Sequence, residues 1–311
     1  MGRVVLVTGG SGFLGSSLIS ALLERGDHVV AISHNNSAFD ERCTVVQGDL
    51  SRIHLLNDIP FFDYYACFHL AGSSSVPYSW ADPVEDFNKG LPGTVGLLRF
   101  LAQHYPNCRL VVSSSAAVYG NPVVLPINEQ ATISPISPYG IHKAAIELLC
   151  EHYSSLFDIP IKIMRIFSAY GRGLRKQLLW DTANKLENAV LVGQSSIHLS
   201  GTGFESRDFI HMSDVARAAI LLADASLPSN FNIINVASGN EVQICKVVNL
   251  LCNLWGHDVT PVFSGESRPG DPCRWVADIS QLSSLGFSPC MDIKAGIQDY
   301  VAWARGVLSA R

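Results

Sequence analysis

The chain has 311 residues, of which 48% are hydrophobic, and a formal net charge of −5. This length and apolar content are ample for a large α/β domain, or for one domain with a smaller lobe. The charged residues form no basic block, so we expect no nucleic-acid partner. No apolar run approaches the ~20 residues of a membrane helix, and the sequence shows no secretion signal ahead of the first apolar run.

The eight cysteines are scattered along the chain, and neither a C-x-x-C pair nor a histidine stands at metal-ligand spacing. Several lie inside apolar segments, which is typical of small core residues in a reducing compartment. We therefore predict a cytoplasmic protein with no membrane partner and no metal site.

The first 33 residues predict a strand, a glycine-rich turn, a helix and a second strand. The turn contains Gly9, Gly12 and Gly15, and the second strand is expected at 28–33. In this setting Gly9 permits a tight turn, Gly12 lets the backbone approach a pyrophosphate, and Gly15 lets the helix pack closely on the sheet. The helix N-terminus then offers N–H donors and a positive dipole to phosphates. The segment predicts dinucleotide binding.

The end of the second strand lacks the carboxylate that usually binds the adenosine ribose in NAD enzymes. The chain continues there through Ser33, His34 and Asn35. Their hydroxyl and amide groups can accept a 2′-phosphate, which His34 or Arg42 can neutralise. The segment therefore favours NADP over NAD, with NAD as the alternative and a polar loop without cofactor contact as the third interpretation.

The alternation of strands and helices continues to the middle of the chain. Further strands are expected at 44–50, 65–72 and 109–115, with a helix at 91–105. Strands that alternate with helices form right-handed βαβ units and a parallel sheet, whose ligands lie at the C-terminal strand ends. Asp49 would reach the adenine there, and small residues and serines end the next two strands.

Tyr139 and Lys143 stand four residues apart at the start of a segment with helical apolar spacing. That spacing puts both side chains on one face of a helix. A tyrosine normally ionises near pH ~10, and a nearby cation favours its phenolate. Lowering the pKa by about three units takes ~4 kcal/mol of differential stabilisation. The result would be a base that takes a proton from a sugar hydroxyl near neutral pH.

Several short motifs follow one another along nearly the whole chain. They are Thr8-Gly9-x-x-Gly12-x-x-Gly15, His69-Leu70-Ala71-Gly72, the run Ser113 to Gly120, Tyr139-x-x-x-Lys143, Arg165-Ile166-Phe167-Ser168-x-Tyr170-Gly171, Gly201-Thr202-Gly203 with Arg207 to His211, and Arg268-Pro269-Gly270-Asp271. In this order they resemble the extended short-chain dehydrogenase/reductase family, in its branch of nucleotide-sugar epimerases and dehydratases. The resemblance implies an α/β fold with a Rossmann-type, doubly wound parallel sheet and a smaller C-terminal lobe.

The resemblance also implies a domain division. The NAD(P)-binding domain is expected at residues 1–170, with returning segments near 205–238. The smaller lobe, at 171–204 and 239–311, is expected to bind the nucleotide sugar. Within the returning part, Phe231 to Val236 would rejoin the main sheet, and Asp214 would cap a helix that begins at Val215.

The resemblance assigns roles to individual residues. Tyr139 is the acid/base, Lys143 binds the nicotinamide ribose and lowers the Tyr139 pKa, and Ser115 hydrogen-bonds the reacting sugar hydroxyl, with Ser114 as the neighbour most easily confused with it. The predicted cofactor-binding residues are Gly9, Gly12, Phe13, Leu14, Ser33, His34, Asn35, Asp49, Leu50, Leu70, Ala71, Gly72, Ser113, Tyr139 and Lys143. The predicted substrate-binding residues are Ser74, Ser115, Ser168, Arg207 and Arg268, and the two arginines would grip the nucleotide diphosphate in a bidentate way.

The chain departs from the family pattern at two places. Dehydratases of the family carry Asp-Glu directly after the reacting Ser/Thr, whereas this chain has Ala116-Ala117, so dehydration lacks its catalysts. Gly90 stands where the family usually has an asparagine ahead of Gly93. The prediction is a nucleotide-sugar 4-epimerase of the UDP-hexose type, acting by hydride transfer at sugar C4. The alternative is an NADPH-dependent reductase of a nucleotide 4-keto-6-deoxy sugar, and in either case the resemblance implies a homodimer.

Overall fold

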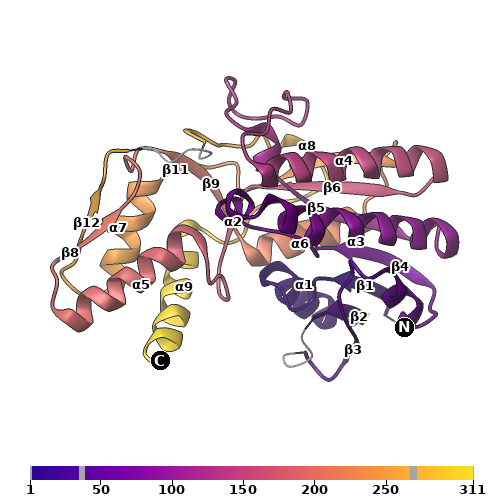
Figure 1. The fold of residues 1–311 in the computed structure, drawn as a ribbon, viewed down its shortest axis with the longest axis horizontal. Coiled ribbons are helices and arrows are strands. Elements are labelled where there is room, and N and C mark those ends of the chain that lie inside the picture. Colours follow the sequence, from indigo (N-terminus) through magenta and orange to yellow (C-terminus); the bar gives the residue numbers. More distant parts are fainter. Residues whose placement is uncertain (1, 35–38, 267–271, 311) are drawn as a thin grey trace.

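The computed structural model describes residues 2–34, 39–266 and 272–310. Its centre is a seven-stranded sheet with the strand order β10-β6-β5-β4-β1-β2-β3, and each neighbouring pair is parallel (Figure 1). The strands are β1 Val4–Thr8, β2 His28–Ser33, β3 Cys43–Gln47, β4 Tyr64–His69, β5 Arg109–Ser115, β6 Ile161–Ile166 and β10 Phe231–Val236. The predicted parallel sheet is confirmed, and β10 rejoins it as expected.

Helices cover both faces of this sheet. Helices α1 (Phe13–Glu24) and α6 (Met212–Asp224) share one apolar core with it, and α3 (Pro83–His104) and α4 (Pro138–Phe157) share the other. A sheet covered on both faces needs strands that are apolar throughout, which explains the continuous apolar runs in the sequence. Ligands of such sheets lie beyond the C-terminal strand ends.

Helix α3 begins eight residues before the predicted start at Leu91. The Asp82 carboxylate caps it by accepting the Glu85 N–H at 2.9 Å, and Pro83 occupies its first turn. An acidic cap followed by proline is a favourable helix start. Pro92 lies inside the helix, where it interrupts the sequence pattern, so the prediction placed the boundary too late.

Helix α4 forms as predicted, but a different face of it is buried. Leu148, Leu156 and Phe157 belong to the apolar pattern and are exposed on the surface. The buried positions include Lys143 and Glu147. The side that faces the sheet therefore carries ionisable groups, and part of the apolar pattern faces outward.

A smaller group of elements lies to one side of the main sheet (Figure 1). It contains a three-stranded sheet of order β11-β9-β7 and the parallel pair β12-β8, and helices α5, α7 and α9 pack around one apolar core. These elements are β7 Ser168–Tyr170, α5 Gln177–Val192, β8 Ser196–Leu199, β9 Ser206–His211, β11 Glu241–Gln243, α7 Ile244–Trp255, β12 Thr260–Phe263 and α9 Ile293–Leu308. Within the predicted returning segment, β10 joins the main sheet and α6 covers it, whereas β9 pairs with β7 and β11.

Short helices complete the fold. They are the 3₁₀ helices at Ile53–Asp58 and Ala116–Tyr119, with α2 Val76–Ala81 and α8 Ser280–Ser284. In the described part of the chain, none of the helices combines the length and apolar character needed to cross a bilayer. The described residues also contain no group of three His, Cys, Asp or Glu side chains placed to hold a metal ion.

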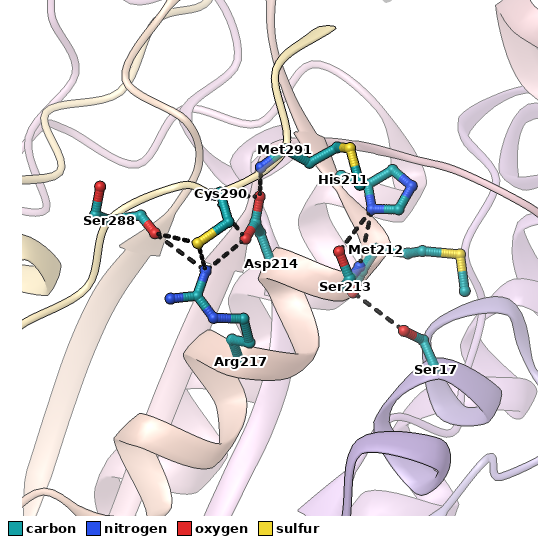
Figure 2. Close-up of polar contacts among 9 residues, drawn as sticks. All are labelled: Ser17, His211, Met212, Ser213, Asp214, Arg217, Ser288, Cys290 and Met291. Atoms are coloured by element: carbon teal, nitrogen blue, oxygen red, sulfur yellow. Dashed lines mark hydrogen bonds and ion pairs between the residues drawn. The ribbon is translucent and has the colours of Figure 1, made fainter. Parts of the chain in front are cut away.

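The start of α6 corrects one prediction. The helix begins at Met212, and the His211 side chain caps it by accepting the Ser213 N–H at 3.3 Å. Asp214 lies inside the first turn instead, where its carboxylate accepts backbone N–H groups from Cys290 and Met291 (Figure 2). Asp214 therefore has the structural role that was expected, but it ties the C-terminal segment to the helix rather than capping it.

Candidate active site

A cavity of about 1020 Å³ lies at the C-terminal ends of the main strands. Its wall combines the glycine-rich turn after β1, the loops after β2, β3 and β4, the end of β5, the start of α4, and residues of β7, β9 and α5. A cavity of this size suits a ligand larger than one drug-sized molecule. Every predicted site residue that the structure describes lies on this wall; Asn35 and Arg268 lie outside the described residues.

The glycine-rich turn has the shape that a dinucleotide needs. Gly9 has a φ of 72°, and a Cβ there would lie 2.7 Å from the Ala71 nitrogen. A Cβ at Gly15 would lie 2.2 Å from the Gly9 carbonyl oxygen, so the helix could not pack this closely with another residue. Gly12 caps α1 without a side-chain hydrogen bond, and no acidic residue occupies the first turn. The N–H groups of that turn are therefore suited to a diphosphate, and the turn fits the cofactor.

The adenosine end of the cavity is formed by the ends of β2 and β3. Ser33 and His34 line the cavity there, as does Asp49, which lies two residues beyond the end of β3. Burial opposes ionisation of Asp49, but hydrogen bonds from Ser51 outweigh it and lower the carboxyl pKa. A carboxylate therefore stands at the end of the cavity that is predicted to hold the adenosine. It follows β3, whereas the acidic residue of NAD enzymes usually stands at the end of the second strand.

Arg42 is engaged elsewhere. Its guanidinium binds the Asp40 carboxylate at 2.6 and 2.8 Å, and both side chains are exposed. The cation that was offered as a partner of a 2′-phosphate is thus neutralised by its own neighbour. This arrangement removes one of the two side chains that were expected to neutralise a 2′-phosphate.

Tyr139 is positioned by the start of α4. Ser137 caps this helix by accepting the Gly140 N–H at 3.2 Å, Pro138 follows, and the Tyr139 N–H donates to Ser79 Oγ at 3.0 Å. The Ser115 side chain lies close enough to the Tyr139 phenol to lower its pKa. The structure thus brings the predicted acid/base and the predicted sugar-binding serine together.

Lys143 lies one turn further along α4 and is buried. Its Nζ donates to the Ser113 carbonyl oxygen at 3.0 Å and lies 5.7 Å from the centre of the Tyr139 ring. The end of β5 therefore positions both groups, because Ser113 holds the ammonium and Ser115 meets the phenol.

The phenol pKa corrects a prediction. Burial raises the pKa of Tyr139 to about 12, against the Ser115 hydrogen bond that lowers it, and the Asp86 carboxylate raises it further. Lys143 is not among the groups that lower it, and burial depresses the pKa of the Lys143 ammonium itself to about 8. In the protein alone, desolvation of the phenol therefore sets the direction of the Tyr139 pKa shift, and Lys143 does not make the phenol acidic.

Ser114 is distinguished from Ser115 by its partner. Its hydroxyl donates to the Glu147 carboxylate, which is buried and paired with Arg165 at 2.8 Å. Arg165 also donates to the Tyr119 hydroxyl at 2.9 Å. Ser114 lines the cavity as well, but its hydroxyl belongs to the buried network of Glu147 and Arg165, and Ser115 is the serine near the Tyr139 phenol.

The predicted substrate residues that the structure describes lie on the wall of the same cavity. Ser74, Ser168 and Arg207 line the cavity, and the Arg207 guanidinium lies 5.6 Å from the centre of the Trp275 ring. Ala117 lines it as well.

Two features of the site were not predicted. Lys176, which precedes α5, lines the cavity and donates to Ser74. Behind Tyr139 and Lys143, the buried Asp86 carboxylate binds His142 Nδ1 at 2.7 Å. Neither feature was evident from the residues alone, because Lys176 follows two arginines in a short basic run that is typical of a surface, and helix spacing alone cannot pair residues on different helices.

The fold and the site define a dinucleotide-binding α/β protein with a tyrosine-lysine-serine centre. Residues 5–237 match the model of the NAD dependent epimerase/dehydratase family. The chain therefore belongs to this family.

Relatives of known sequence and structure agree with this assignment. The chain is 30% identical to a putative UDP-glucose 4-epimerase of Methanocaldococcus jannaschii, covering 97% of this chain and 98% of that protein. The crystal structure of UDP-glucose 4-epimerase with UDP-glucose from Thermotoga maritima matches with a TM-score of 0.88 at 25% identity, over 98% of this chain and 100% of that one. UDP-glucuronic acid 4-epimerase from Bacillus cereus, in complex with UDP-glucuronic acid and NAD, matches with a TM-score of 0.85 at 27% identity, over 98% and 100%. A solved relative thus carries NAD, and the preference for NADP finds no support.

Proposed function

We propose that this protein is an NAD-dependent UDP-sugar 4-epimerase. The observation that carries the proposal is the meeting of Tyr139, Ser115 and Lys143 in the same cavity as the glycine-rich turn. Similarity to UDP-glucose and UDP-glucuronate 4-epimerases over nearly the whole chain supports the reaction class. The proposed roles follow from what each side chain contacts.

Tyr139 handles the proton of the reaction. In its phenolate form it takes the proton of the sugar C4 hydroxyl as the C4 hydride leaves, and as the resulting phenol it returns that proton to the oxygen when the hydride comes back on the other face. NAD, when bound, supplies the hydride acceptor at its nicotinamide ring and then the donor. Ser115 holds the reacting oxygen near the phenol, and Lys143, fixed by Ser113, holds the nicotinamide ribose.

The other cavity residues would hold the ligands in place. We assign the dinucleotide diphosphate to the turn at Gly9–Leu14 and the adenosine to the ends of β2 and β3. We assign the nucleotide of the substrate to the smaller lobe, at residues 171–204 and 239–311, together with Arg207. A guanidinium suits a diphosphate because it binds two oxygens at once.

NAD is the proposed cofactor rather than NADP. The Asp49 carboxylate stands at the adenosine end, and Arg42 is already paired with Asp40. A 2′-phosphate would therefore meet a negative charge and one cation fewer. Mass spectrometry of ligands released from the denatured protein should detect NAD; recovery of NADP alone would contradict the assignment.

The reaction itself is tested without added reduced cofactor. Purified protein incubated with UDP-glucose, UDP-glucuronate or UDP-N-acetylglucosamine should produce the C4 epimer of at least one of them, detected by chromatography or NMR. Failure to form an epimer from any of the three UDP-sugars would refute the proposal. Stoichiometric NADPH oxidation that requires a nucleotide 4-keto sugar would instead identify the reductase.

The protein is further proposed to be a homodimer. Apolar side chains stand exposed on two helices that pack side by side on one face of the sheet, namely Val84 and Phe87 on α3, and Ile141 and Leu148 on α4. Ile141 and Leu148 are seven residues apart and share one face of α4. An exposed apolar surface of this kind is typical of a protein interface, and pairing it with a second copy would form a four-helix contact.

A further inference from the structure

Lys176 brings an ammonium group into the cavity. It lies between β7 and α5, in the smaller lobe, and its Nζ donates to the carbonyl oxygen of Ser74 at 3.0 Å and to the Ser74 hydroxyl. Ser74 lies in the loop after β4, the central strand of the main sheet. The contact therefore joins the two sides of the cavity.

The charge of Lys176 has no acidic partner among the described residues. Four carboxylates line the same cavity, and each is engaged: Asp49 accepts the Ser51 N–H at 2.9 Å, Glu85 pairs with Lys89 at 3.5 Å, Asp181 pairs with Lys185 at 2.7 Å, and Glu205 accepts the N–H groups of Thr202 and Gly203, each at 2.9 Å. Both recorded partners of Lys176 are neutral oxygens of one serine. Its positive charge is therefore not compensated within the described part of the chain.

An ammonium has three N–H donors. Two of those of Lys176 are used on Ser74, so one is left for a further acceptor among the groups that the cavity admits. Removing a charge from water without a counter-charge is unfavourable, and burial accordingly lowers the pKa of Lys176. A negatively charged ligand would supply both the missing acceptor and the missing charge.

The position of Lys176 indicates that its ammonium group faces the part of the cavity assigned to the substrate. Burial is the main cause that lowers the pKa of Lys143, and the charge of Lys176 lowers it further, so the two ammonium groups lie within electrostatic range of each other. Lys176 thus lies toward the reacting end, whereas the cofactor diphosphate is assigned to the turn at Gly9–Leu14. The neighbouring Ser74 is itself a predicted substrate residue.

We propose that Lys176 binds an oxyanion of the nucleotide-sugar substrate. This inference rests on the proposed function and deepens it. Two substrate groups have the required chemistry, namely the diphosphate, which is present in every UDP-sugar, and the carboxylate of a uronic acid. If the carboxylate is bound, Lys176 determines which sugar the enzyme accepts.

The test removes the charge of Lys176 in one variant and keeps it in another. Lys176→Met and Lys176→Arg are compared with the wild type and with Lys185→Met, a control on α5 whose lysine pairs with Asp181 and is absent from the cavity wall. Calorimetry on the NAD-loaded proteins gives dissociation constants for UDP, UDP-glucose and UDP-glucuronate. KM and kcat are measured separately with each sugar that the wild type converts.

A diphosphate contact predicts that Lys176→Met weakens binding of all three ligands by at least ~10-fold, the scale of one hydrogen bond to a charged group. A carboxylate contact predicts the same loss for UDP-glucuronate alone, with UDP and UDP-glucose within about threefold of the wild type. In both cases the loss should appear in KM more than in kcat, Lys176→Arg should restore most of the binding, and Lys185→Met should change nothing beyond threefold.

Three results would overturn the inference. They are unchanged binding of all three ligands by Lys176→Met, an equal loss in Lys176→Arg, and a loss of bound NAD with unchanged binding of the UDP ligands. The binding measurements do not require an active enzyme. A wild type that binds UDP but makes no epimer would therefore refute the proposed function and still leave the role of Lys176 open to this test.

Discussion

Lys143 and Tyr139 share one face of α4, yet the ammonium does not bond the phenol. The Lys143 Nζ lies 5.7 Å from the centre of the Tyr139 ring and donates to the Ser113 carbonyl oxygen, while the neighbour that lowers the pKa of the phenol is Ser115. The end of β5 thus holds the two groups separately. Their contributions to catalysis and to stability should therefore be separable by substitution.

Tyr139→Phe removes the proposed acid/base and leaves the ring in place. We expect a folded protein that retains its cofactor but loses at least ~10²-fold in kcat, the scale of a positioned acid/base. Tyr153→Phe, on the same helix, is the matched control and should remain within about twofold, because Tyr153 is absent from the cavity wall. The measurement is the rate of C4 epimerisation together with the mass of the released dinucleotide. Near-normal turnover in Tyr139→Phe would refute the assignment.

Lys143→Met should reveal the stability cost of burying the ammonium. Burial lowers the pKa of Lys143 from its usual 10.5 to about 8, a shift worth about 3 kcal/mol. The unfolded chain therefore binds this proton more tightly between those two pH values. Wild-type stability gains from this residue as the pH rises through that window, and the full cost applies below it.

The variant lacks this cost, although the Ser113 carbonyl oxygen loses its donor, at ~1–3 kcal/mol. We therefore compare urea unfolding of the wild type and Lys143→Met near neutral pH and again near pH 10. Relative to the wild type, the variant should lose about 2–3 kcal/mol between the two conditions. A difference that does not depend on pH would show that the ammonium is not desolvated as the structure indicates.

The sequence predicted the parts of this protein that depend on local pattern. Strands β2 and β5 begin and end at the predicted residues, because a strand buried on both faces is apolar over its whole length. The site residues were found because motif spacing in this fold brings strand ends together. The apolar pattern did not show which face of a helix is buried, because an apolar residue such as Leu148 can face the core or a partner subunit.

The electrostatics were the least predictable part. The phenol of Tyr139 was expected to be acidic because a cation stands four residues away. Its pKa is raised instead, because burial depends on tertiary packing that spacing does not encode. Lys176 was missed for a related reason, since only the folded chain shows that every carboxylate of the cavity is already engaged.

Arg165→Met tests the buried ion pair behind the cavity wall. The guanidinium binds the buried Glu147 carboxylate at 2.8 Å, and the substitution would leave that carboxylate without its counter-charge. Breaking such a pair typically costs about 3–5 kcal/mol. Lys185→Met breaks an exposed pair with Asp181 and should cost at most about 1 kcal/mol. Urea unfolding measures both, and equal small losses would contradict the prediction.

Leu148→Glu tests the proposed dimer surface of α3 and α4. Leu148 is 55% exposed, so the single subunit tolerates a charge there, but a partner packed on it would force that charge out of water. We expect the wild type to have the mass of a dimer in light scattering at micromolar concentration, and the variant to have the mass of a monomer with an unchanged circular dichroism spectrum. Leu191→Glu, at a 74% exposed position on α5, is the control and should stay dimeric. A monomeric wild type, or a dimeric Leu148→Glu, would show that this apolar surface is not the interface.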